Sequence, residues 1–84
     1  MSKAEIEKVI KDHLYEDFIG EGNQEELTES LHLYDAGILD SIGTLQLADF
    51  IEKKWPITIE AHEMMKANFS TIEAICNFIE RKMA

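Results

Sequence analysis

Hydrophobic residues in the first fifth of the chain recur with a helical period. Val9 falls on the same side as this series, while lysines and acidic residues occupy the remaining positions. The series that repeats every four residues comprises Ile6, Ile10, Leu14 and Phe18. The pattern predicts an amphipathic helix over roughly residues 3–19, which Gly20 and Gly22 would end.

Three more helical segments follow. The second is expected to begin near Asp40 and Ser41, either of which could cap it, and to stop before Pro56. Residues 60–67 predict a short third helix. The form S-x-x-E at residues 70–73 is that of a capping box and opens a last helix. The apolar face of the second helix comprises Leu47, Phe50, Ile51 and Trp55, with Thr44 and Ala48 beside it, and that of the last comprises Ile72, Ile75, Cys76 and Ile79.

The segments between these helices also contain apolar residues. Residues 20–40 are expected to pack against the core, with a short helical turn after Asn23, because a structureless loop of this length is unusual in a small domain. Their apolar residues are Leu27, Leu31, Leu33, Tyr34, Ile38 and Leu39. Ile57-Thr58-Ile59 alternates as a strand does, but it is short and alone, so we expect an extended connector. The sequence therefore predicts an all-α fold: one domain over residues 1–84, built as a small four-helix bundle with a long loop between the first two helices.

Charge narrows the range of functions. The 84 residues carry a net charge of −9, and 45% of them are hydrophobic, as in an ordinary globular domain. Residues 1–40 hold eleven acidic residues and three lysines, whereas residues 41–84 are almost balanced. Nucleic acid is excluded as a partner by this imbalance, since phosphate contacts require clustered Lys and Arg. An acidic surface suits basic partners, although it can also be simply a solvated face.

Composition also suggests a location. A single cysteine fits a reducing compartment, and no apolar run is long enough to span a membrane. Residues 1–5 lead into charged helical sequence, unlike a signal peptide. We therefore expect a monomeric, cytoplasmic protein.

The residues of familiar catalytic and metal sites do not occur at useful spacings. His13, His32 and His62 lie too far from one another and from Cys76 for a zinc motif. Cys76 itself falls on an apolar helix face, where a buried, inert thiol is expected. The loops that bind calcium or nucleotide phosphates are also missing. We therefore expect that the protein is not an enzyme.

Ser41 is the residue that offers chemistry. It follows Asp40 at the expected start of a helix, just after a loop that contains Gly37. A phosphate ester at this position would lie near backbone N–H groups and the positive end of the helix dipole. Taken alone, however, the Asp-Ser pair favours a simple helix cap over an attachment site.

The surrounding sequence resembles the phosphopantetheine-dependent carrier proteins, a family that includes acyl, peptidyl and D-alanyl carriers. The segments that carry the resemblance are Leu33-Tyr34-Asp35-Ala36-Gly37, Asp40-Ser41-Ile42 and Phe69-Ser70-Thr71-Ile72. Residues 40–47 are most similar to the corresponding stretch of D-alanyl carriers. Residues 42, 43, 46, 55 and 56 depart from the patterns usual in one or another branch of the family.

The resemblance implies a specific function. Ser41 would carry a 4′-phosphopantetheine arm derived from coenzyme A, and Asp40 would help the phosphopantetheinyl transferase to position its metal and substrate. The arm would hold an acyl or aminoacyl group as a thioester, loaded by a ligase and passed to downstream transferases. An acidic, carrier-like interaction module that is never modified remains the alternative.

The second helix is the expected docking surface for these partners. The candidate docking face comprises Ile42, Leu45, Gln46, Asp49 and Glu52. Ile42 and Leu45 lie off the apolar stripe of this helix, so exposure and burial are both compatible with the pattern.

Overall fold

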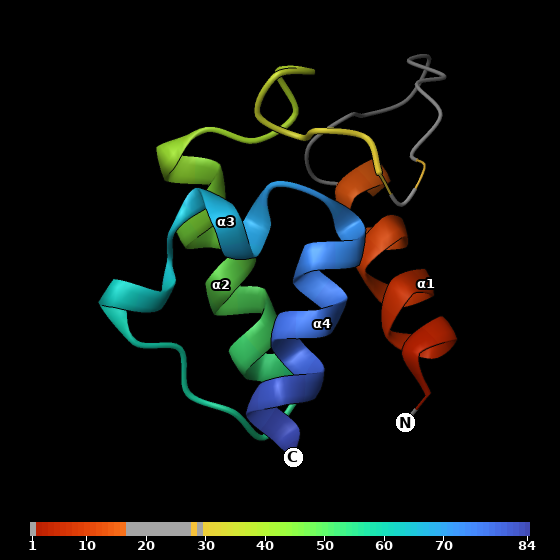
Figure 1. Ribbon diagram of the computed structural model, residues 1–84, viewed down its shortest axis with the longest axis vertical. Helices are drawn as coiled ribbons and strands as arrows, with labels where there is room; N and C mark the ends of the chain where they lie inside the picture. The colour runs from red at the N-terminus through yellow and green to blue at the C-terminus, as the bar shows by residue number, and fades with distance from the viewer. Residues whose placement is uncertain (1, 17–27, 29) are drawn as a thin grey trace.

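A computed structural model describes residues 2–16, 28 and 30–84 of the chain. Within these residues the chain forms four α-helices, one short 3₁₀ turn and no strand (Figure 1). In chain order the elements are α1 (Lys3–Leu14), α2 (Ser41–Lys54), η2 (Ala61–Glu63), α3 (Lys66–Phe69) and α4 (Ile72–Met83). The expected all-α, four-helix fold is thus confirmed. No helix in the described ranges combines the length and apolar character needed to cross a membrane.

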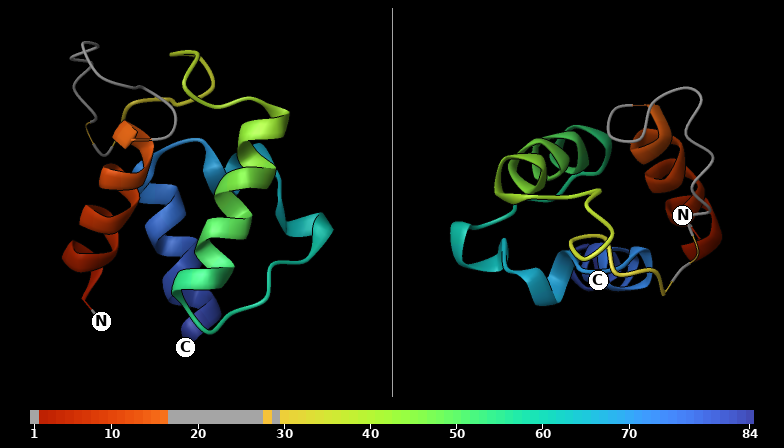
Figure 2. Two further views of the ribbon diagram at one scale, coloured as in Figure 1. Left: turned by 180° about the vertical axis from the view of Figure 1, so that it is seen from behind. Right: turned by 90° about the horizontal axis from the view of Figure 1, so that it is seen from above.

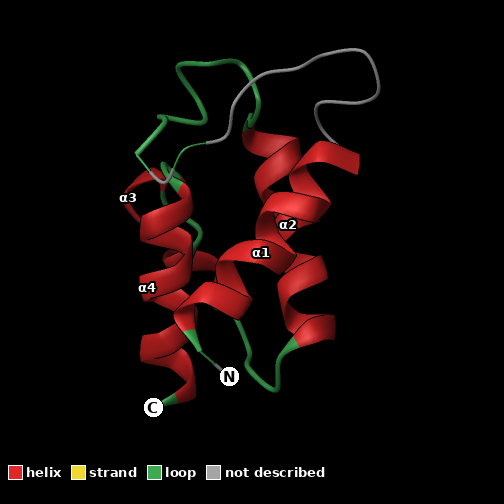
Figure 3. Ribbon diagram, turned by 90° about the vertical axis from the view of Figure 1, so that its right-hand side faces the viewer, coloured by secondary structure: helices red, strands yellow, loops and turns green. Residues whose placement is uncertain are grey.

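The three long helices lie side by side along the long axis of the molecule. α2 and α4 run in the same direction and α1 runs in the opposite one, and from above the three form a triangle (Figures 1 and 2). The loop before α2 crosses one end of this triangle, and α3 packs against α4 near the same end. Figure 3 shows this loop above the helices. Because α2 begins at that end, its first turn lies beside both the loop and α3.

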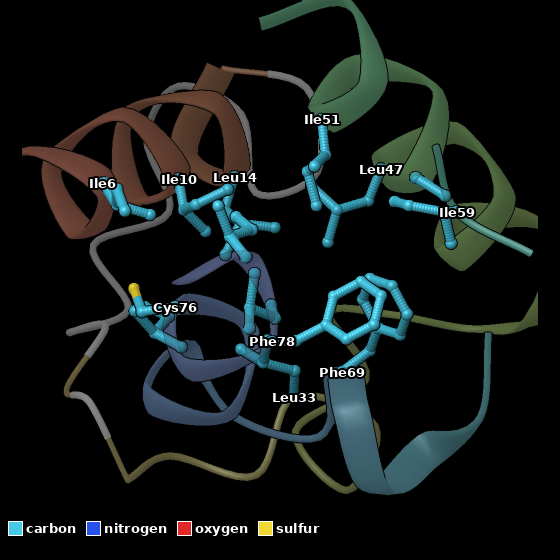
Figure 4. Packing of buried hydrophobic residues seen from close by; sticks show 14 of the residues in the cluster. Ile6, Ile10, Leu14, Leu33, Leu47, Ile51, Ile59, Phe69, Cys76 and Phe78 are labelled. Atoms are coloured by element: carbon cyan, nitrogen blue, oxygen red, sulfur yellow. The ribbon is translucent and has the colours of Figure 1, made fainter. Parts of the chain in front are cut away.

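The core fills the centre of the triangle, where the apolar faces of the long helices meet (Figure 4). The stripes predicted from the sequence account for most of it, and only Phe50 of the second stripe is partly buried. α4 also contributes Phe78, which contacts Phe69 of α3 at a ring-centroid distance of 5.6 Å. The fully buried side chains are Ile6, Ile10, Leu14, Leu33, Leu47, Ile51, Phe69, Ile72, Ile75, Cys76 and Ile79. The expectation of a buried cysteine is therefore confirmed.

Side-chain caps begin the three long helices, but one of them differs from the prediction. The hydroxyl of Ser2 accepts the Glu5 N–H at the start of α1. At α4 the cap is Thr71, whose Oγ1 accepts the Ala74 N–H at 3.0 Å. The predicted capping box with Ser70 as cap is therefore wrong by one residue. Serine and threonine are both favoured N-cap residues, with serine slightly preferred, so residue type alone does not predict Thr71.

The predicted helix over residues 60–67 is also divided. Glu60 and Glu63 form a capping box around η2, and Met64 then leaves helical geometry. The side-chain amide of Asn68 donates to the carbonyl oxygen of Glu63 at 2.7 Å, which satisfies the end of this turn. α3 therefore starts only at Lys66 and is four residues long.

The remaining expectations concern the connecting segments. Residues 57–59 form no strand, and Ile59 is buried in the core, as an extended connector would allow. Its backbone N–H donates to the carboxylate of Glu52 in α2 at 2.8 Å. The expected end of the first helix at residue 19, its glycine stop and the helical turn after Asn23 lie outside the described residues.

Candidate functional site

The loop over residues 30–40 is held in place by Leu33. This side chain is fully buried, and its backbone N–H donates to the carbonyl oxygen of Ser70, between α3 and α4, at 2.7 Å. The carbonyl oxygen of Leu33 in turn accepts the N–H groups of Ile38 and Leu39. Gly37, which lies between Leu33 and Ile38 in the chain, has a φ of +77°, a conformation that favours glycine. These contacts fix the chain just before α2 begins.

Asp40 and Ser41 are adjacent at the start of α2 but have different roles there. Asp40 is the N-cap, and its Oδ1 accepts the Gly43 N–H at 2.6 Å. Ser41 is the first residue of the helix and is exposed. Its hydroxyl has no hydrogen-bond partner in the part of the chain that the structure describes. The cap is therefore Asp40, which leaves the oxygen of Ser41 available for chemistry.

Two partly buried hydrogen bonds connect the loop to this first turn. Thr44 Oγ1 donates to the carbonyl oxygen of Asp40 at 2.8 Å, and the Tyr34 hydroxyl lies 2.6 Å from the same Oγ1. Since a threonine hydroxyl has one proton, which is directed to Asp40, Tyr34 is the donor in the second bond. Thr44, in the turn that carries Ser41, is thereby bonded to both Tyr34 and Asp40.

A cleft opens beside Ser41, between the first turn of α2, the loop and the segment around α3. Its volume is about 360 Å³. Apolar and aromatic side chains form much of the wall, and Lys66 adds a positive charge. The lining residues are Tyr34, Ser41, Thr44, Leu45, Ala61, Met64 and Lys66.

The segment around Glu63, which leads into the far wall of the cleft, contacts the end of α4. Lys82 Nζ lies 2.8 and 3.1 Å from the two carboxylate oxygens of Glu63. Glu63 also accepts the backbone N–H of Glu60 at 2.9 Å. The hydrogen bond from Lys82 and that from the Glu60 backbone lower the pKa of Glu63 below its ordinary value of 4.5. An ionised carboxylate thus anchors the chain that leads to Met64 and Lys66.

Comparison with known proteins identifies the family. A protein-family model described as a phosphopantetheine attachment site matches residues 12–79 of the sequence. These residues include α2, the residues that line the cleft and most of α4. The chain belongs to the phosphopantetheine-dependent carrier proteins. The resemblance noted in the sequence is therefore confirmed.

Relatives of this carrier protein come from two branches. It is 25% identical over 79 residues to a probable acyl carrier protein, PigG, of Serratia sp., covering 94% of this chain and 90% of the relative. It is 32% identical over 73 residues to a D-alanyl carrier protein of Streptococcus mutans, covering 87% and 84% of the two chains. A D-alanyl carrier protein of Listeria welshimeri is 36% identical over 64 residues, or 67% of this chain and 82% of its own length.

The prosthetic group of this carrier protein is accordingly covalent 4′-phosphopantetheine. The residues at the start of α2 fit such a group, because an exposed, unengaged hydroxyl stands at the edge of a cleft. When attached, the arm supplies a thiol at the end of a long flexible chain.

The candidate docking face lies on the outside of α2, and the structure decides between exposure and burial for its apolar members. Ile42 and Leu45 are 66% and 58% exposed, so neither belongs to the core. Gln46 and Asp49 are exposed as well, and Asp49 pairs with Lys53 at 2.9 Å. Ile42, Leu45, Asp49 and Glu52 share one face by their helical spacing.

Of the residues that line the cleft, the sequence predicts site roles only for Ser41 and Leu45. It places Thr44 beside the apolar stripe and predicts no role for Lys66. Both Thr44 and Lys66 contact Tyr34, which lies 10 residues before Thr44. No local spacing connects such positions. The one available signal was a hydroxyl residue among core positions of the first turn, since a buried threonine needs a hydrogen-bond partner.

Proposed function

We propose that Ser41 is the attachment point of 4′-phosphopantetheine, and that the protein carries an acyl or aminoacyl group on this arm as a thioester. The observation that carries the proposal is the division of roles at the start of α2. Asp40 caps the helix, and the exposed hydroxyl of Ser41 stands unengaged beside the cleft.

The attachment step requires only an acceptor oxygen from this chain. Ser41 Oγ forms a bond to the phosphorus that bears pantetheine in coenzyme A, while the pyrophosphate bond breaks and adenosine 3′,5′-bisphosphate leaves. The serine proton passes to a base of the phosphopantetheinyl transferase. Asp40 retains one carboxylate oxygen that does not cap the helix, and we propose that it helps to position the metal ion of the transferase.

Under the same proposal, partner enzymes bind the outer face of α2. Ile42 and Leu45 offer exposed apolar contacts next to Ser41, flanked by Gln46 and Asp49. The transferase, a loading ligase and downstream transferases would dock there. Glu52 belongs to the same face, although its carboxylate already accepts the Ile59 N–H.

We place this function in the cytoplasm, in a monomeric single domain over residues 1–84. The arm ends in a thiol, and a reducing compartment keeps such a thiol free for loading.

Intact mass spectrometry of the protein purified from its native cells tests the carried group. We expect a population heavier than the holo protein, and neutral hydroxylamine should return it to the holo mass because hydroxylamine cleaves thioesters. The mass lost would identify the cargo as aminoacyl or fatty acyl. A native population that consists only of the unmodified chain would contradict the proposal and favour the unmodified interaction module.

A further inference from the structure

Lys66 places a positive charge in the cleft that Ser41 borders. Its ammonium group lies over the ring of Tyr34, 5.4 Å from the ring centroid. Tyr34 is itself held by its hydroxyl, which donates to Thr44 in the first turn of α2. Tyr34, Lys66 and Ser41 all line this one cleft.

The ammonium group of Lys66 is available for a further anion. Several cations of the described chain have a carboxylate within 4.0 Å, among them Lys8, Lys11, Lys53 and Lys82. No such carboxylate lies within this distance of Lys66 among the described residues. Lys3, Lys54 and Arg81 also have no carboxylate within this distance among the described residues, but of these four cations only Lys66 lines the cleft beside Ser41.

Attachment of the arm would create an anion at this place. A phosphodiester on Ser41 carries one negative charge and is directly adjacent to Asp40, whose carboxylate is held at the helix start. Like charges at this spacing repel each other, and a nearby cation offsets that repulsion. Lysine suits the task because its flexible four-carbon stem lets the ammonium group move to the phosphate.

We propose that the Lys66 ammonium group binds the phosphodiester formed on Ser41 and draws the first part of the arm into the cleft. The inference rests on the proposed attachment at Ser41. It assigns to Lys66 the role of a binding residue for the arm, and to the Tyr34 ring the role of a support that holds the cation near the phosphate before the arm arrives.

Nuclear magnetic resonance on apo and holo protein tests this inference, and Lys54 is a matched control within the same molecule. Lys54 also lies over an aromatic ring, that of Phe50, at 5.9 Å. It is thirteen residues beyond Ser41 in α2, about 20 Å along the helix axis. The pKa of each lysine is followed through its ε-carbon resonance, with the thiol of the arm alkylated so that it does not titrate.

We expect the pKa of Lys66 to rise from apo to holo protein, because an adjacent anion favours the charged form, and no such change at Lys54. The ³¹P resonance of the phosphodiester at neutral pH should shift in Lys66→Gln and not in Lys54→Gln. Holo protein with the same Lys66 pKa as apo protein, and the same ³¹P shift in both variants, would overturn the ion pair alone. Absence of any attachment at Ser41, seen by mass before the titration, would overturn the proposed function and this inference together.

Discussion

At the scale of single residues, Asp40 and Ser41 are neighbours with separable roles. The Asp40 carboxylate stabilises the start of α2, whereas the Ser41 hydroxyl makes no contribution to the cap. We predict that Asp40→Ala lowers the free energy of unfolding by about 0.5–2 kcal/mol. Ser41→Ala should change it by less than about 0.5 kcal/mol, since it removes only an exposed hydroxyl. Urea denaturation followed by circular dichroism measures both, and an equal loss in the two variants would contradict the assignment of the cap.

Asp40→Asn separates the cap from the proposed role of the charge. Asparagine caps helices about as well as aspartate, so the stability should stay near that of the wild type. The negative charge is lost, however, and the rate of phosphopantetheine transfer should fall, because a neutral amide is a poorer partner for a magnesium ion. A time course of holo formation by mass spectrometry checks this. An unchanged rate would show that Asp40 serves only as a cap.

The residues at the start of α2 were predictable from sequence, and most of those that line the cleft were not. Asp40 and Ser41 are adjacent and carry a local motif, so their position near the helix start followed from the pattern alone. Lys66 and Tyr34 are separated by 32 positions and meet only because the loop and α3 fold against the same end of the bundle. Their contact depends on tertiary packing, which hydrophobic periodicity does not encode.

At the scale of elements, the loop before α2 behaves as part of the core. Leu33 is fully buried and exchanges backbone hydrogen bonds with Ser70, Ile38 and Leu39. We predict that Leu33→Ala costs about 2–5 kcal/mol of unfolding free energy, as for a helical core leucine. Leu31→Ala is the matched control in the same loop. Leu31 is only partly buried, so its truncation should cost clearly less, and equal effects would show that the loop is not anchored at Leu33.

The ion pair between Glu63 and Lys82 should make the stability of the folded protein depend on pH. The folded-state pKa of Glu63 lies below its ordinary value, so the pair stabilises the folded state above that ordinary value. This stabilisation is lost as the pH falls through the lowered folded-state pKa. We therefore predict that Lys82→Gln is less stable than the wild type at pH 7, and that the difference shrinks as the pH falls below 4.5.

Urea denaturation of both proteins across this pH range measures the difference. Lys53→Gln is the control, because it removes an exposed pair with Asp49 on the surface of α2 and should have little effect at any pH. A stability difference for Lys82→Gln that does not change between pH 7 and pH 3 would contradict the assigned linkage.

Sequence patterns predict the long helices well, but not the helix starts around residues 60–71. The long helices follow from stripes of apolar residues, because burial of one face against the core determines their register. The chain over residues 60–71 has no such stripe, and side-chain hydrogen bonds determine its turns. The side chains of Glu63 and Thr71 accept backbone N–H groups, and that of Asn68 donates to a backbone carbonyl oxygen. Several residues of similar capping strength stand next to one another there, so the helix starts could not be assigned from sequence.

At the scale of the whole molecule, the bundle keeps a small exposed site at one end of a stable core. Three long helices bury their apolar faces in the centre, while Ser41, the cleft and the exposed side chains of Ile42 and Leu45 lie at or near the end of the bundle where α2 begins. Variants of the exposed residues should therefore alter attachment or docking without unfolding the protein. Attachment at Ser41 can therefore be tested with a single substitution.

The most direct test is the intact mass of the purified apo protein after incubation with coenzyme A, magnesium and a phosphopantetheinyl transferase of broad specificity. We expect one phosphopantetheine group to be added to the wild type and none to Ser41→Ala, with both proteins equally folded by circular dichroism. Addition of the group to Ser41→Ala, or no addition to a folded wild type while the same transferase modifies another carrier protein, would contradict the assignment of Ser41.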